Sequence, residues 1–247
     1  MQYSQFVELY ESLAKTPKHL EKTSILAEFL KKLKYNSQLI YLLKGRVFPD
    51  YDPREFGISD KLVMKVISRA SGQSEAEIYK KLRKLGDLGE ITEELVEKRK
   101  QSILFYKKLE AEKVFENLSK LVEIQGKGAV DKKLSFILEI INSASGKEAK
   151  YIIRTLLSDL RVGAADGILR DALAQAFLQD EQAPEIIERA YDISNDYALV
   201  FQEAVKGRKY LEEINIAPGK PLKVMLPVKV TEIEEAFRIC GKPAAIE

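Results

Sequence analysis

The chain has 247 residues, of which 45% are hydrophobic and 32% are charged, so it is long enough to fold as one or two globular domains. The net charge of +2 is nearly neutral, and nucleic-acid binding would therefore need local clusters of Lys and Arg rather than a global excess. A single cysteine, Cys240, excludes an internal disulfide, and no apolar run reaches the length of a membrane span. We expect a monomeric, cytoplasmic protein that has no membrane segment.

Apolar side chains recur at helical spacing along most of the chain, and this pattern predicts an all-α fold of about 12 helices. Ser74 with Glu77 predicts a capping box, and Pro184 suits the first turn of a helix. Thr23 or Ser24 suits the N-cap of another helix. The twelve predicted helices of the main body span residues 3–13, 24–33, 37–43, 61–70, 74–85, 92–100, 109–124, 132–141, 151–159, 168–178, 184–191 and 196–205, and one further short helix is predicted at 231–237.

Residues 156–166 predict a sharp corner between two helices. Gly163 leaves room for a phosphate or another backbone to approach closely, and the amides at the start of the next helix would point outward with Arg161 beside them. A helix N-terminus with a nearby cation favours phosphate binding. The alternative is an ordinary helix–helix turn with a solvated Arg.

The same corner occurs twice. Residues 57–70 match residues 163–176 in the positions of the glycine, the aspartate, the apolar stripe and the closing alanine. Arg46 stands where Arg161 stands, with a longer loop after it, and residues 26–30 parallel residues 134–138. An offset of about a hundred residues is far longer than a solenoid period and predicts two related helical halves, about 1–100 and 109–214. If the halves pack face to face, they present two basic corners related by an approximate two-fold axis.

Three further stretches carry weaker signals. Lys127 lies between Gly126 and Gly128, where a phosphate could approach, but the Gly-Lys-Ser/Thr spacing of a P-loop is absent. In residues 101–106 a glutamine is followed by a cluster of apolar and aromatic side chains, and lysines and an arginine flank the segment. This pattern resembles the sliding-clamp-binding peptide of replication proteins. The alternative is a connection whose apolar side chains are buried. Residues 215–247 contain several prolines and predict an extended linker, one short helix and the beginning of a strand at 243–247.

The order of several motifs resembles the ATP-dependent DNA ligases of the archaeal/eukaryotic replicative type over the whole chain. The motifs are Gly86-Asp87-Leu88-Gly89-Glu90, Gly126-Lys127-Gly128, Glu148-Ala149-Lys150-Tyr151, the 160–166 corner and Pro221 to Leu226. The resemblance implies a helical DNA-binding domain over residues 1–214. It also implies that residues 215–247 are a linker and the first short elements of an α/β adenylation domain. The lysine that carries AMP would lie two residues beyond Glu247, so we expect this segment alone not to ligate DNA.

The resemblance also assigns residues to roles. The DNA-binding positions are Arg161, Gly163 and Ala165, followed by Arg46, Gly57, Ser59, Lys127 and Gly128. Glu247 matches the position that contacts ATP, and the clamp-binding positions are Gln101, Leu104, Phe105 and Tyr106. Two departures are Asp159, where relatives often carry a cation, and Leu104, where they commonly carry an aromatic residue.

The function that the resemblance implies is sequence-independent binding of nicked duplex DNA through the backbone and the minor groove. The complete enzyme would use ATP and Mg²⁺ to seal the nick, whereas this segment would need no cofactor. The alternative is a helical adaptor whose main partner is a sliding clamp. A self-contained enzyme is disfavoured because no clustered His or Cys and no Gly-x-Ser-x-Gly motif is present.

Overall fold

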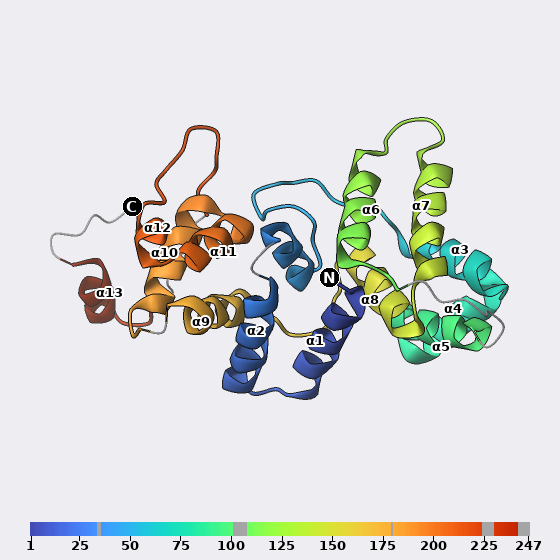
Figure 1. Ribbon diagram of the computed structural model, residues 1–247, viewed down its shortest axis with the longest axis horizontal. Coiled ribbons are helices and arrows are strands. Elements are labelled where there is room, and N and C mark those ends of the chain that lie inside the picture. Colours follow the sequence, from blue (N-terminus) through green and yellow to red (C-terminus); the bar gives the residue numbers. More distant parts are fainter. Residues whose placement is uncertain (34–35, 101–107, 179, 224–229, 242–247) are drawn as a thin grey trace.

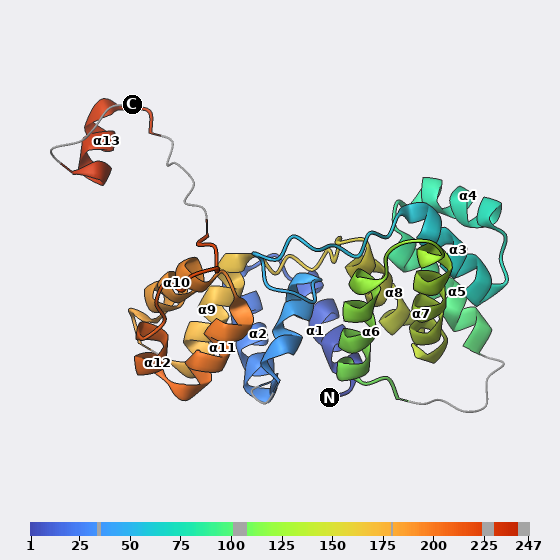
Figure 2. The same cartoon turned by 90° about the horizontal axis from the view of Figure 1, so that it is seen from above.

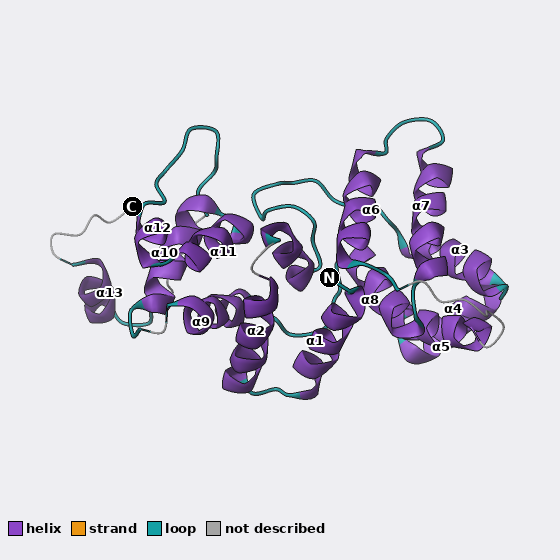
Figure 3. Ribbon diagram, viewed as in Figure 1, coloured by secondary structure: helices purple, strands orange, loops and turns teal. Residues whose placement is uncertain are grey.

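The computed structural model describes residues 1–33, 36–100, 108–178, 180–223 and 230–241. Within these ranges the regular elements are all helical, and the one extended contact is an isolated antiparallel bridge between Gln2 and Glu110 (Figure 3). The all-α prediction is therefore confirmed. The predicted strand at 243–247 lies outside the described residues.

The described residues form thirteen α-helices and one 3-10 helix, η1. They are α1 (Tyr3–Lys15), α2 (His19–Leu33), η1 (Ser37–Lys44), α3 (Asp60–Ser71), α4 (Glu75–Leu85), α5 (Leu88–Lys100), α6 (Ala111–Glu123), α7 (Ala129–Ser143), α8 (Gly146–Leu156), α9 (Asp166–Phe177), α10 (Ala183–Ser194), α11 (Tyr197–Lys206), α12 (Arg208–Glu212) and α13 (Ile233–Cys240).

The helix ends follow local sequence signals in most places. Ser74 and Glu77 form the predicted capping box at the start of α4, and Pro184 lies in the first turn of α10. Asp196 accepts hydrogen bonds from the first amides of α11. Side chains that bind free amides fix where a helix begins, and these signals are readable from a few adjacent residues.

Several local predictions are wrong, among them the starts of α5, α7 and α8, which lie at Leu88, Ala129 and Gly146 rather than at residues 92, 132 and 151. The second helix begins at His19 rather than at a cap on Thr23 or Ser24, because Thr23 is a buried residue within it. Residues 37–44 form a 3-10 helix instead of an α-helix, and α12 follows Gly207 although no helix was predicted there.

The two sequence halves exchange helices instead of packing face to face. Helix α2 of the first half packs against α9 of the second, and the corresponding helix α7 of the second half packs against α3 of the first. In the same way, η1 of the first half packs against α11 of the second, and α8 of the second half packs against α5 of the first. Helices α1 and α6 meet at the centre, next to the bridge between Gln2 and Glu110. The long-range packing therefore repeats itself across the molecule, but neither half has a separate core.

The molecule is elongated, with α9 to α12 at one end, α3 to α5 at the other and α1 between them (Figure 1). A single network of buried apolar side chains runs through both ends. At the centre, the Tyr10 and Tyr151 rings lie 4.9 Å apart, and the Tyr10 hydroxyl donates to the Leu42 carbonyl at 2.8 Å. These contacts join α1, α8 and η1, which come from both sequence halves.

Candidate nucleic-acid interface

Both predicted corners belong to long loops that cross the molecule. The loop 45–59 runs from η1 to α3, and the loop 157–165 runs from α8 to α9 in the opposite direction along the same edge (Figure 2). The loops touch, since a β-carbon built on Gly45 would lie 3.5 Å from the Leu160 β-carbon. The fold therefore places both glycine corners on one edge, at the ends of loops that lie side by side.

The second corner has an unusual backbone. Ser158, Arg161 and Gly163 all adopt positive φ angles, of 55°, 55° and 63°. Left-handed conformations disfavour residues with a β-carbon and cost about 1–3 kcal/mol each where the surrounding structure imposes them. Such outliers concentrate at functional sites, which supports a binding role for this loop.

Arg161 is half-exposed but is already engaged by carboxylates. Its Nε lies 2.6 Å from Asp159 Oδ2 and its Nη1 lies 3.3 Å from Asp87 Oδ2. The hydrogen bond to Asp159 raises the pKa of Arg161 above its usual value. The side chain reaches the start of α5 rather than the first amides of α9, so the expectation that Arg161 sits beside its own corner helix is wrong. Because the loop crosses the molecule, its arginine lies near the other half.

Asp87 holds this part of the site together. It is 6% exposed, accepts hydrogen bonds from the Gly89 and Glu90 amides, and lies 2.5 Å from Arg154 Nη2. Burial raises the pKa of Asp87, but the hydrogen bond and charge of Arg154 outweigh it and hold that pKa below its usual value. Asp87 thus caps the first amides of α5, and it is also the anchor for Arg161.

Arg154 is a functional residue of this site for which no role was predicted from the sequence. A signal was present, because Arg154 directly follows Tyr151-Ile152-Ile153 in the apolar stripe of α8. An arginine at a core position needs a buried carboxylate partner. What the sequence could not supply is which carboxylate, since Asp87 lies 67 residues away along the chain.

The two corner helices begin differently. Ser59 is the N-cap of α3, and its side chain accepts a hydrogen bond from the Leu62 amide. Ala165 is the N-cap of α9 and has no side chain that could do the same, so the first amides of α9 are without a side-chain cap. The cation beside this helix is Lys44, whose Nζ lies 2.8 Å from Asp166 Oδ1.

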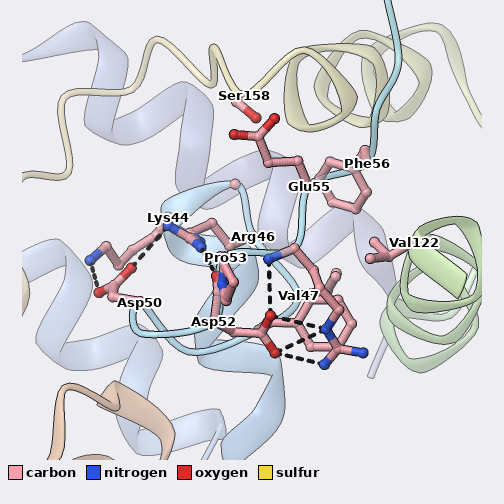
Figure 4. A pocket seen from close by; sticks show the side chains of 13 residues that line it. Lys44, Arg46, Val47, Asp50, Asp52, Pro53, Glu55, Phe56, Val122 and Ser158 are labelled. Carbon is pink, nitrogen blue, oxygen red and sulfur yellow. Dashed lines mark hydrogen bonds and ion pairs between the residues drawn. The ribbon is translucent and has the colours of Figure 1, made fainter. Parts of the chain in front are cut away.

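A cavity of about 570 Å³ lies under the first loop (Figure 4). Its wall includes Lys44, Arg46 and Arg54 from the first loop region and Ser158 from the second loop. Arg46 donates to the Asp52 carbonyl at 3.0 Å and is 38% exposed. Each of these cations already pairs with a carboxylate, Lys44 and Arg46 with Asp50 and Arg54 with Asp52, so a phosphate would compete with an internal ion pair for each of them.

Lys127 and Gly128 lie in the turn between α6 and α7. Gly128 is the N-cap of α7 with a φ of 81°, and both residues are exposed. Among the described residues, no hydrogen bond or ion pair joins either of them to a corner loop. The structure therefore brings Arg161 near Asp87 and Arg46 near Asp52.

Several predicted residues lie outside the described part of the chain. They are Gln101, Leu104, Phe105, Tyr106 and Glu247. The described helices include none that is long and apolar enough to cross a membrane. In the same ranges, no group of three or more His, Cys, Asp or Glu side chains could hold a metal ion.

Comparisons with known proteins agree on one family. Residues 2–174 match the family described as DNA ligase N terminus. The chain is 38% identical over 250 residues to a DNA ligase of Thermococcus fumicolans, and the alignment covers 100% of this chain and 44% of that relative. It is 40% identical over 240 residues to a DNA ligase of Methanosphaera stadtmanae, covering 95% of this chain and 42% of that relative.

A DNA ligase of Methanopyrus kandleri is 36% identical over 251 residues, with 100% of this chain and 44% of the relative aligned. The chain thus spans less than half the length of these relatives. The family match covers both corner loops and ends within α9, so it concerns the same helical body that carries the candidate interface. The chain belongs to the DNA ligase N-terminal family.

Proposed function

We propose that this chain is the DNA-binding part of an ATP-dependent DNA ligase and that it holds nicked duplex DNA along the edge formed by the two corner loops. Support comes from the family match and from the placement of both loops on one edge. The two DNA strands run in opposite directions, as the two loops do. The complete protein would seal nicks in replication and repair, in the cytoplasm.

The proposed contacts are to the DNA backbone and minor groove. Arg161, Gly163 and Ala165 would bind at the second corner, where Gly163 and Ala165 are exposed and α9 lacks a side-chain cap. The matching set at the first corner is Arg46, Gly57 and Ser59, and Lys127 with Gly128 is a further set in the turn between α6 and α7. Amides and cations that bind phosphates fix position but do not read sequence, so binding would be independent of sequence.

The carboxylates near the arginines set the strength of this binding. Arg161 would have to exchange Asp159 for a phosphate, and the negative charge of Asp159 would oppose the incoming DNA. The net charge of +2 adds little long-range attraction. We therefore expect moderate affinity that falls steeply as salt is added.

Ligation would belong to the complete enzyme. ATP and Mg²⁺ would be its cofactors, Glu247 would contact ATP, and the nucleophilic lysine would follow two residues later. This segment should not ligate by itself. Residues 101–106 would bind a sliding clamp of the PCNA type, and the protein would act as a monomer.

The test is fluorescence anisotropy of a nicked duplex at several KCl concentrations. We expect Arg161→Ala to weaken binding about tenfold, because a hydrogen bond to a charged partner is lost. Asp159→Asn should strengthen binding roughly two- to fivefold by releasing Arg161 from an exposed ion pair. Asp180→Asn, which alters a carboxylate near Arg208 at one end of the molecule, is the control and should leave affinity unchanged. Wild-type binding that is insensitive to both salt and Arg161→Ala would contradict the proposal.

A further inference from the structure

A buried lysine lies directly beneath the second glycine corner. Lys22 of α2 is 9% exposed, and its Nζ donates to the carbonyls of Val162 and Gly163, each at 3.1 Å. A β-carbon built on Gly163 would overlap this ammonium. Gly163 is exposed and has no side chain, so residue 163 leaves the Lys22 ammonium uncovered on that side, where any other residue would cover it.

The first corner repeats this arrangement. Lys133 of α7 donates from its Nζ to the Phe56 carbonyl at 2.6 Å, and a β-carbon on Gly57 would lie 3.2 Å from that Nζ. Each lysine comes from the exchanged helix, α2 in one case and α7 in the other. The helix exchange thus delivers one ammonium to the base of each corner.

Among the described residues, no carboxylate forms an ion pair with Lys22 or Lys133. Lys22 is buried against carbonyl dipoles alone, which leaves its charge uncompensated at a cost in a site of low polarity, and Lys133 is partly buried in the same way. An ammonium has three donors, and the carbonyls take two on Lys22 and one on Lys133. A remaining donor and a remaining charge therefore favour an anion at each corner.

We propose that Gly163 and Gly57 act as windows through which the Lys22 and Lys133 ammonium groups each bind a phosphate of the DNA backbone. This inference rests on the proposed function and adds two binding residues to it. The glycine is needed because any side chain would cover the ammonium, and the neighbouring carbonyls hold it in place before DNA arrives. The lysines bind phosphate directly instead of merely bracing the loops.

Methionine variants test the charge. Lys22→Met and Lys133→Met keep most of the side-chain volume but remove the ammonium. Each should weaken binding of a nicked duplex about tenfold at low salt and reduce the slope of log K against log[KCl] by about 0.9, the value for one phosphate contact. Lys31→Met is the matched control, because Lys31 lies on α2 but pairs with Glu28 on the surface. It should change neither quantity.

Thermal unfolding followed by circular dichroism separates binding from bracing. A Lys22 variant with a lower melting temperature but an unchanged salt slope would assign the lysine to loop support and overturn the proposal. If Lys22→Met does not fold, Lys133→Met, at a less buried site, decides by the same slope. If binding depends on Arg161 but both lysine variants keep the wild-type salt slope, the lysines do not bind phosphate. That result would overturn the present inference but not the proposed function. Absence of wild-type binding would remove the proposed function itself.

A glycine variant tests the window without changing charge. Gly163→Ala should weaken binding and lower the salt slope, since the new methyl group covers the ammonium. Gly72→Ala is the matched control for backbone strain, because Gly72 has a φ of +78° and nothing within 4 Å of a built β-carbon. Both variants impose alanine on a left-handed backbone, so equal effects on DNA binding would contradict the window.

Discussion

At the residue scale, one carboxylate connects helix capping, core packing and the candidate interface. Asp87 accepts from two amides at the start of α5, pairs with buried Arg154 and reaches Arg161 at the surface. A buried charge pair is sensitive to loss of one partner, because the other is left without compensation. Changes at Asp87 should therefore affect stability and the position of Arg161 together.

The pH dependence of stability should report on Asp87. Arg154 holds the pKa of Asp87 below its usual value despite burial, so the ionised group stabilises the fold above its ordinary pKa of about 3.9. That stabilisation is lost as pH falls through the lower, folded value. We expect the free energy of unfolding in urea to drop more steeply below about pH 4 in the wild type than in Asp87→Asn.

The same variant should be less stable at neutral pH by about 3 kcal/mol, since Arg154 keeps no ionised partner of comparable geometry. Asparagine can still cap the helix, so the loss is not one of capping. Asp180→Asn serves as the control because Asp180 is a surface carboxylate. Parallel pH profiles for wild type and Asp87→Asn would show that Asp87 does not carry this dependence.

At the element scale, the same capping motif occurs in two different settings. Ser74 caps α4 on the surface, and Ser145 caps α8, which is buried along much of its length. Both form a capping box with a glutamate three residues later. The partner of Ser145, Glu148, is 4% exposed, whereas Glu77 is exposed. The setting, and not the motif, should decide the cost of removing each cap.

We expect Ser74→Ala to cost about 1 kcal/mol of unfolding free energy and Ser145→Ala about 2 kcal/mol, the upper part of the range for N-caps. Water can replace the lost hydrogen bond on α4, but the buried end of α8 gives it less access. Chemical denaturation of both variants measures the difference. Equal costs, or a larger one for Ser74→Ala, would show that burial does not govern these caps.

At the scale of the whole molecule, the exchange of helices makes the two halves depend on each other. Within residues 1–100 alone, three helices would be without their main packing partners: α2 packs against α9, α3 against α7, and α5 against α8. These contacts bury apolar faces that would otherwise be exposed, and isolated helices of this length are marginal in water. The two corners consequently keep their relation only while the whole body is folded.

We expect a fragment of residues 1–100 to lack a cooperative thermal transition in far-UV circular dichroism, whereas the full chain melts in a single step. Mixing it with a fragment of residues 109–247 should restore helical signal, because each fragment supplies the helices that the other lacks. A cooperative melt of the first fragment alone would indicate that the halves are independent after all.

The sequence by itself determined the helical class, most helix positions and both glycine corners. Periodicity, caps such as Ser74 and the repeat of residues 57–70 at 163–176 act within a few residues or by direct comparison, so they can be read without contacts. The signal of Lys22 was present too: a lysine four residues before Leu26, on a face that is buried. It had no interpretation without the partner that it meets.

The tertiary structure decided which helices meet. Helix periodicity identifies the apolar face of a helix but not the helix that covers it. Many different pairings would bury the same face equally well, and the one that forms depends on residues far away in the sequence. The exchange of α2 and α7 was therefore unreadable from the sequence, and so was everything that depends on it. The packing of the two halves places Arg161 at Asp87 and Lys44 at Asp166. It also places Lys22 beneath Gly163 and Lys133 beneath Gly57.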